Sequence, residues 1–171
     1  MLKRIAITGP ESTGKSTLSR QLSRHYHTVW VSEYAVDYLA EYGPDYTLED
    51  VLKMAKGQLE HENDLAHVAT KRLFCDTDLL VFKIWCDVVF GEVPAWIEEQ
   101  LESHIYDLYL LCSPDIPWRP GLFRENPNDR EYLFQLYLRQ LAARNLNYKI
   151  IEGKGMERLA NALSFVDELT V

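Results

Sequence analysis

The chain alternates between two hydrophobic patterns. Short apolar runs, typical of strands buried on both faces, lie at 2–8, 28–32, 72–77, 107–112 and 148–152. Apolar residues three or four positions apart predict helices through Leu18, Leu22 and Tyr26 and over 33–42, 47–70, 79–90, 94–103, 130–145 and 156–169. This alternation predicts an α/β fold with three layers, in which about five parallel strands form a sheet with helices on both faces.

Local signals set the ends of several of these helices. Thr47 with Asp50 three residues later is a variant of the capping box, and Gly91 is expected to end the helix that precedes it. Gly57 lies inside the longest helical pattern, where we expect it to mark a bend. The sequence shows no linker, repeat or low-complexity tract, so we expect one domain over 1–171.

Composition and charge narrow the class of partner. The hydrophobic fraction of 47% is typical of a soluble globular protein, and the net charge of −8 disfavours binding to a nucleic-acid backbone or an anionic membrane. No apolar run approaches the roughly 18 residues of a membrane span. Cys75, Cys86 and Cys112 lie in apolar stretches, which predicts buried free thiols. We therefore expect a cytoplasmic protein that acts on a small molecule; whether it forms a homo-oligomer stays open.

A phosphate-binding pattern follows the first predicted strand. The segment 9–17 reads Gly-Pro-Glu-Ser-Thr-Gly-Lys-Ser-Thr and matches G-x-x-x-x-G-K-[ST]. Its glycines let the backbone approach phosphates, and its N–H groups with the following helix N-terminus cradle negative oxygens. The pattern in this setting predicts a P-loop NTPase fold that binds a nucleoside triphosphate. The expected nucleotide contacts are Gly9, Glu11, Ser12, Thr13, Gly14, Lys15, Ser16 and Thr17.

Polar side chains follow the other predicted strands, at the edge where ligands gather in α/β folds. Lys15 is expected to reach the β- and γ-phosphates, while Ser16 and Asp76 hold Mg²⁺. Glu33 can accept a proton from an attacking hydroxyl or bind an acceptor's hydroxyls; the alternative is a first-turn acid stabilised by the helix dipole. Asp78 is a candidate substrate contact, and its alternative role is to cap the next helix.

The segment 113–130 predicts a lid. It carries four prolines and three arginines, whereas 84–118 contains no lysine or arginine. We expect Arg124 to stabilise charge on the transferred group and Arg119 to contact the nucleotide, with solvated surface arginines as the alternative. Trp118 is expected to contact the substrate or to pack the lid shut.

Three further features concern the ligands. Gly153 and Lys154 follow the fifth strand and are expected to border the adenine pocket. Tyr34 is a candidate to stack on a substrate ring, and core packing is the alternative. Residues 33–69 carry nine acids and two lysines, which favours a neutral or cationic acceptor over a phosphorylated one.

Together these segments resemble the NadR-type ribosylnicotinamide kinases and their stand-alone relatives among P-loop kinases. The resemblance implies ATP- and Mg²⁺-dependent phosphorylation of the 5′-hydroxyl of nicotinamide riboside, which gives nicotinamide mononucleotide for NAD salvage. The stretches that carry it are the loop at 9–17, Ser-Glu-Tyr-Ala (32–35), Asp-Thr-Asp-Leu-Leu (76–80), Tyr-Asp-Leu-Tyr-Leu-Leu (106–111), Pro-Asp-Ile-Pro-Trp (114–118), and Arg-Glu-Asn-Pro with Asp-Arg-Glu within 124–131.

The chain departs from the family pattern at two places. Val36 stands where the family often has an arginine, and Pro120-Gly121 stands where many members carry an aspartate. A kinase for another nucleoside-like acceptor is therefore one alternative. The other is a regulatory module that binds or hydrolyses ATP and phosphorylates nothing.

Overall fold

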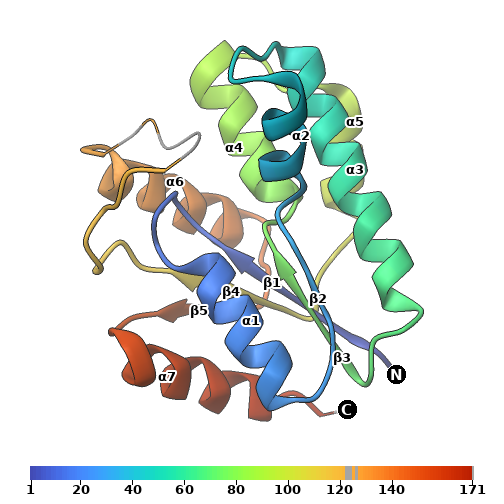
Figure 1. Ribbon diagram of the computed structural model, residues 1–171, viewed down its shortest axis with the longest axis vertical. Coiled ribbons are helices and arrows are strands. Elements are labelled where there is room, and N and C mark those ends of the chain that lie inside the picture. The colour runs from blue at the N-terminus through green and yellow to red at the C-terminus, as the bar shows by residue number, and fades with distance from the viewer. Residues whose placement is uncertain (122–124, 126, 171) are drawn as a thin grey trace.

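The computed structural model describes residues 1–121, 125 and 127–170, and it contains a parallel sheet (Figure 1). The sheet order is β2-β3-β1-β4-β5, so the first strand lies at the centre. Its strands are β1 (Lys3–Thr8), β2 (Trp30–Val31), β3 (Arg72–Asp76), β4 (Leu108–Cys112) and β5 (Tyr148–Ile151). The predicted parallel sheet of five strands is confirmed.

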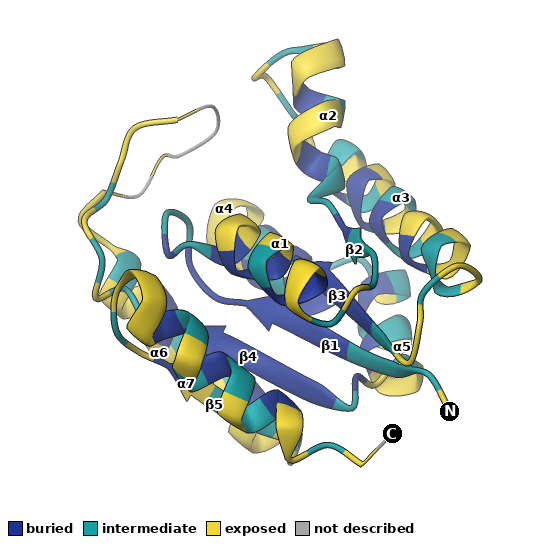
Figure 2. Ribbon diagram, turned by 60° about the horizontal axis from the view of Figure 1, so that its bottom comes forward, coloured by how far each residue is buried: buried dark blue, intermediate teal, exposed yellow. Residues whose placement is uncertain are grey.

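Helices cover both faces of this sheet, which gives the three expected layers (Figure 2). Helices α1 and α7 pack on one face, and α2 to α6 lie on the other side. The helices are α1 (Lys15–His25), α2 (Tyr34–Tyr42), α3 (Leu48–Ala66), α4 (Leu79–Phe90), α5 (Ala95–Ser103), α6 (Arg130–Ala143) and α7 (Gly155–Asp167). Among the described residues, no helix combines the length and apolar character that crossing a membrane requires.

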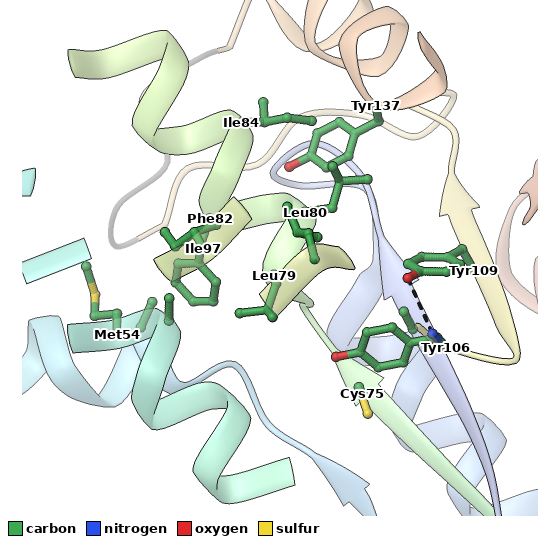
Figure 3. Close-up of a cluster of buried hydrophobic side chains, with 14 of the residues drawn as sticks. Met54, Cys75, Leu79, Leu80, Phe82, Ile84, Ile97, Tyr106, Tyr109 and Tyr137 are labelled. Carbon is green, nitrogen blue, oxygen red and sulfur yellow. Dashed lines mark hydrogen bonds between the residues drawn. The ribbon is translucent and has the colours of Figure 1, made fainter. Parts of the chain in front are cut away.

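The strands feed two hydrophobic cores because successive side chains point to opposite faces. Ile5 and Ile7 of β1 pack with α1 and α7, whereas Ala6 faces the larger core on the other side. Figure 3 shows part of that larger core, where Phe82 and Ile97 meet between α4 and α5. All three cysteines are buried, as predicted, and they are free thiols.

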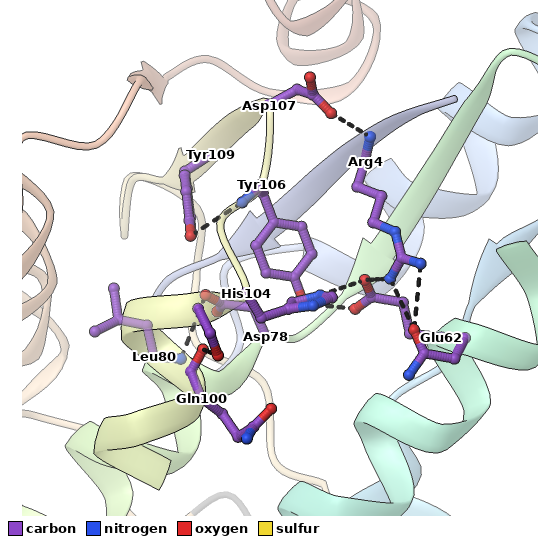
Figure 4. A network of polar contacts seen from close by, with 11 residues as sticks. Arg4, Glu62, Asp78, Leu80, Gln100, His104, Tyr106, Asp107 and Tyr109 are labelled. Atoms are coloured by element: carbon purple, nitrogen blue, oxygen red, sulfur yellow. Dashed lines mark hydrogen bonds and ion pairs between the residues drawn. The ribbon is translucent and has the colours of Figure 1, made fainter. Parts of the chain in front are cut away.

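A buried carboxylate ties the larger core together. Glu62 of α3 is fully buried and accepts hydrogen bonds from Arg4 and Tyr106, and it also pairs with His104 (Figure 4). Burial alone would raise the pKa of Glu62, but the hydrogen bonds from His104, Tyr106 and Arg4 outweigh it and lower the pKa. This network joins α3 to β1 and to the chain that enters β4.

Most element boundaries agree with the prediction to within one or two residues, and two of the differences concern the second strand and α3. The second strand is only Trp30–Val31, because the Thr28 N–H donates to the Ser23 carbonyl of α1 at 3.0 Å and is not available for the ladder; only the Thr28 hydroxyl bonds the Arg72 carbonyl of β3. Helix α3 ends at Ala66, short of the predicted end. The capping box of Thr47 and Asp50 is confirmed, and Gly91 ends α4 with a positive φ of 66°.

Gly57 lies within α3, which runs from Leu48 to Ala66, and it allows a close contact with a neighbouring helix. A Cβ built at Gly57 would overlap the Tyr34 ring, which also packs edge-on against His61. Gly57 thus has a packing reason, since the Tyr34 ring of α2 lies directly on the backbone of α3, and the expected bend stays a prediction.

We expect Gly57→Ala to destabilise the fold by about 1 kcal/mol, because overlap costs about 1–3 kcal/mol and the gain in helix propensity is about 1 kcal/mol. Urea unfolding measures the change. In a Tyr34→Ala background the overlap is absent, so the same substitution should stabilise by about 1 kcal/mol. Destabilisation in both backgrounds would contradict this explanation.

Candidate functional site

The loop between β1 and α1 has the backbone that its sequence requires. Gly9, Ser12 and Gly14 have positive φ values of 127°, 55° and 82°. A Cβ at Gly9 would lie 2.9 Å from the Cys112 carbonyl oxygen, so the loop fits against the end of β4 only with glycine there. Gly14 is the N-cap of α1, which places the N–H groups of the first turn at the loop.

Lys15 lies across this loop. Its Nζ donates to the Pro10 carbonyl at 2.8 Å, and the Thr13 hydroxyl donates to the same oxygen at 2.7 Å. Both side chains are buried. The ammonium group is therefore held close to the loop backbone, at the end of the helix dipole that attracts anions.

Asp76 ends β3 beside the loop, since its Cα is the register partner of Ile7 in β1. The carboxylate is 1% exposed, and its Oδ1 has no hydrogen-bond partner in the described structure. Burial, and secondly the charge of Glu33, raise the pKa of Asp76 to about 6, against the lowering effect of Ser16 and Lys15. A buried carboxylate oxygen without a partner, next to a serine hydroxyl, suits a hard cation such as Mg²⁺.

A metal at this place would need further ligands. Across the described residues, no group of three or more His, Cys, Asp or Glu side chains is arranged to hold a metal ion. Mg²⁺ commonly binds through one or two protein groups and completes its shell with waters and substrate phosphates. Ser16 and Asp76 fit that mode, and their role in holding Mg²⁺ stays a prediction.

A cavity of about 420 Å³ is lined by the phosphate loop and by residues of α2, α4 and α6, which are helices on the face of the sheet with the larger core. Glu33 lines this cavity together with the loop, and most of the other lining residues are apolar or aromatic. Three carboxylates line it, from Glu11, Glu33 and Glu125, and Lys15 is its one basic side chain among the described lining residues. The apolar walls are formed by Val36, Leu39, Val81, Ile84, Trp85, Val88, Val89, Leu133 and Tyr137.

The structure places Glu33 as the N-cap residue of α2, but its side chain makes no capping hydrogen bond. The Glu33 carboxylate is therefore not used to cap α2, and Glu33 lines the cavity. Tyr34 differs: its ring lies against Gly57 and His61 of α3 and does not line the cavity, in line with the alternative of core packing.

Asp78 caps helix α4, which is the alternative role considered for it. Its Oδ1 accepts from the Thr8 hydroxyl at 2.8 Å, and its Oδ2 accepts from the Leu80 N–H at 3.3 Å as the cap of α4. Burial raises the pKa of Asp78 to about 6 against these hydrogen bonds. Both oxygens serve the fold, and substrate contact by Asp78 remains a prediction.

The lid segment contacts the phosphate loop through two loop side chains. Glu11 accepts from the Trp118 indole at 3.4 Å and from the Glu125 N–H at 3.1 Å. The Ser12 hydroxyl accepts from the Arg119 N–H at 2.9 Å. Arg124 lies outside the described residues, so its expected role stays a prediction.

Both departures from the family pattern lie in the cavity wall. Val36 and Gly121 are among its lining residues, on α2 and in the lid. Neither side chain offers a charge or a hydrogen bond. The cavity therefore differs from the family pattern in α2 and the lid rather than at the phosphate loop.

The loop after β5 also approaches the phosphate loop, through a residue that the sequence did not single out. Arg158 of α7 is 5% exposed and donates to the carbonyls of Thr13 at 2.8 Å and Gly153 at 2.9 Å. Lys154 is the exposed N-cap residue of α7. A signal for Arg158 existed: it shares one stripe of α7 with the buried Ala162 and Val166.

Known proteins resemble this chain over most of its length. The trifunctional NAD biosynthesis/regulator protein NadR of Escherichia coli K12 is 26% identical over 98% of this chain and 43% of its own length. NadR of Salmonella typhimurium is 27% identical over 86% of this chain and 37% of its own length. The chain thus spans about two fifths of the length of the curated relatives it matches.

Solved structures share the fold. A NadR protein in complex with NAD and AMP-PNP matches with a TM-score of 0.77 and 25% identity, over 98% of this chain and 49% of that chain. A deoxyadenosine kinase from M. mycoides, at 12% identity and a TM-score of 0.66, covers 97% of this chain and all of its own. The P-loop kinase fold is therefore confirmed, as is the resemblance to NadR. A family model described as an AAA domain matches residues 4–158, and the chain belongs to this AAA domain family.

Proposed function

We propose that the chain is an ATP- and Mg²⁺-dependent kinase that phosphorylates the 5′-hydroxyl of nicotinamide riboside. The observation that carries the proposal is one cavity that is lined by the phosphate loop, by Glu33 and by apolar and aromatic side chains of α2, α4 and α6. One end offers the N–H groups and Lys15 that a triphosphate requires, and the other accommodates a flat ring and a sugar. A module that only bound nucleotide would have no use for the second half.

The charges of the cavity favour this acceptor. Glu11, Glu33 and Glu125 line the cavity, and Lys15 is the one basic residue among the described lining residues. A phosphorylated acceptor would meet repulsion from the carboxylates, whereas the cationic nicotinamide ring would meet attraction. The relatives point the same way, since one NadR crystal structure contains NR and another contains NAD and AMP-PNP.

Each residue of the site has a role in this reaction. Lys15 and the loop N–H groups bind the β- and γ-phosphates, and Ser16 and Asp76 would hold Mg²⁺, which supplies charge neutralisation on the phosphoryl oxygens. Glu33 orients the 5′-hydroxyl and accepts its proton as the oxygen attacks the γ-phosphate. ADP leaves, and the new phosphate ester carries the transferred group.

Val36 and Gly121 favour a second candidate acceptor, which is another nucleoside. Both line the acceptor end of the cavity and lack the polar groups of the family pattern. A deoxynucleoside is the natural rival, since a deoxyadenosine kinase shares the fold.

An ADP-release assay with ATP, Mg²⁺ and a panel of nucleosides tests the proposal. We expect nicotinamide riboside to give the highest kcat/KM, with ADP formed in equal amount to nicotinamide mononucleotide. A deoxynucleoside with a higher kcat/KM would replace the acceptor and keep the kinase. ADP release at the level without acceptor for every nucleoside would refute the kinase and favour the regulatory module.

A further inference from the structure

We propose that Arg158 is a positioning residue that fixes the phosphate loop in its binding conformation. It does so by holding the Thr13 carbonyl, which directs the Gly14 N–H toward the phosphates. The inference rests on the proposed function in that it takes the loop to bind a nucleotide's phosphates. It assigns a task to a side chain 145 residues away in the sequence.

The Arg158 guanidinium joins four segments of the chain. Its Nη2 donates to the carbonyls of Thr13 at 2.8 Å and Ser113 at 2.9 Å. Its Nη1 donates to Asp115 Oδ1 at 2.7 Å and to the Gly153 carbonyl at 2.9 Å. These acceptors belong to the phosphate loop, to the first residues of the lid segment just after β4, and to the loop after β5; α7 itself is the fourth segment. Arg158 is buried, so little water competes for these bonds.

Peptide geometry connects the Thr13 carbonyl to the Gly14 N–H. The two groups belong to one planar trans peptide, in which the C=O and the N–H point in opposite directions. Arg158 draws the C=O toward α7, so the N–H faces away from α7. Gly14 is followed in the chain by Lys15, and both residues line the cavity.

Gly14 makes an external restraint necessary. Its φ is 82°, and glycine populates both signs of φ with similar ease, so this peptide has little intrinsic preference for one orientation. An arginine suits the task because its planar fork can hold several carbonyls at once and stays charged at every relevant pH. A lysine at the same place offers one compact ammonium.

If Arg158 served only as a structural ion pair, its replacement would have a different effect. The pair with Asp115, at 2.7 Å, links α7 to the lid and would contribute to stability wherever the loop pointed. If that were all, loss of Arg158 would lower the melting temperature and leave the phosphate affinity of the folded protein unchanged. Positioning predicts a change in phosphate affinity itself.

Calorimetric titration with inorganic tripolyphosphate, without any acceptor, separates the two. We expect Arg158→Gln to bind tripolyphosphate roughly 10- to 100-fold more weakly than the wild type, and Arg158→Lys roughly tenfold more weakly. Arg139→Gln is the matched control, since Arg139 is an exposed arginine on α6, and it should bind within twofold of the wild type. Near-UV circular dichroism identifies the folded variants.

A folded Arg158→Gln that binds tripolyphosphate within twofold of the wild type would overturn the proposal. If that variant does not fold, Arg158→Lys decides in the same way. The kinetic counterpart is a raised KM for ATP with an unchanged KM for the nucleoside. Because tripolyphosphate binding needs no acceptor, a wild type that phosphorylates no nucleoside would refute the proposed function and leave this comparison intact.

Discussion

Replacing Lys15 with alanine is expected to lower kcat/KM for ATP by roughly 10³-fold, the largest loss from any single side chain of the phosphate loop. The Lys15 ammonium is buried and held against the Pro10 carbonyl at 2.8 Å, so its charge acts in a poorly screened setting. Without it, the negative charge that builds on the γ-phosphate would face only the loop N–H groups. Steady-state ADP release in the presence of nicotinamide riboside measures the loss.

The fold should tolerate this substitution. Lys15 makes no ion pair in the described structure, and removing a buried charge also removes the cost of its desolvation. Lys53→Ala is the control, because Lys53 is an exposed lysine paired with Glu49 on α3. A Lys15→Ala protein that retained more than a tenth of the wild-type kcat/KM would contradict a role for Lys15 in transfer.

The order of elements could be predicted from the sequence because it depends on local periodicity. Strand β1, the glycine loop and α1 follow one another within the first 25 residues, so hydrophobic pattern and backbone chemistry agree there. Strand β2 was predicted too long because its length depends on another element: the Thr28 N–H donates to the Ser23 carbonyl of α1, so β2 pairs with β3 only through Trp30 and Val31. The contact at Gly57 could not be predicted for the same reason, since the Tyr34 ring comes from another helix.

The candidate site divides in the same way. Asp76 and Asp78 are two residues apart and both buried, yet one ends a strand beside the loop and the other caps α4. The rule that ligands gather at strand ends separates them only in part, because a capping role depends on where the next helix begins. Arg158 could not be assigned to the loop at all, since its partners are brought together only by the packing of α7 against α1.

The acceptor half of the cavity was the least predictable part. Its walls come from α2, α4, α6 and the lid, which meet only in the folded chain. The sequence showed an acidic excess over 33–69 without showing which acids face a ligand. The structure places Glu33 at the cavity and buries Glu62 in a network with Arg4 and Tyr106, so the same excess serves two separate purposes.

Replacing Glu33 with glutamine is expected to lower kcat by roughly 10²- to 10⁴-fold, the range typical of a lost general base. The amide keeps the shape of the side chain and can still bond a hydroxyl, but it cannot accept the proton. Asp37→Asn is the matched control: Asp37 is an acid in the first turn of α2, close in the chain to the N-cap residue Glu33, and it is exposed. If helix-dipole stabilisation were the purpose of Glu33, the two variants would lose similar stability and neither would lose turnover.

The same substitution has a second consequence that needs no substrate. Burial and the charge of Glu33 raise the pKa of Asp76 to about 6, so Asp76 is ionised above that pH and protonated below it. Glu33→Gln removes the second cause, so the pKa of Asp76 should fall and its carboxylate should persist to lower pH. Carboxyl ¹³C NMR titration of the nucleotide-free protein measures this shift. A lowered Asp76 pKa together with full turnover would keep Glu33 beside the Asp76 carboxylate and remove it from proton transfer.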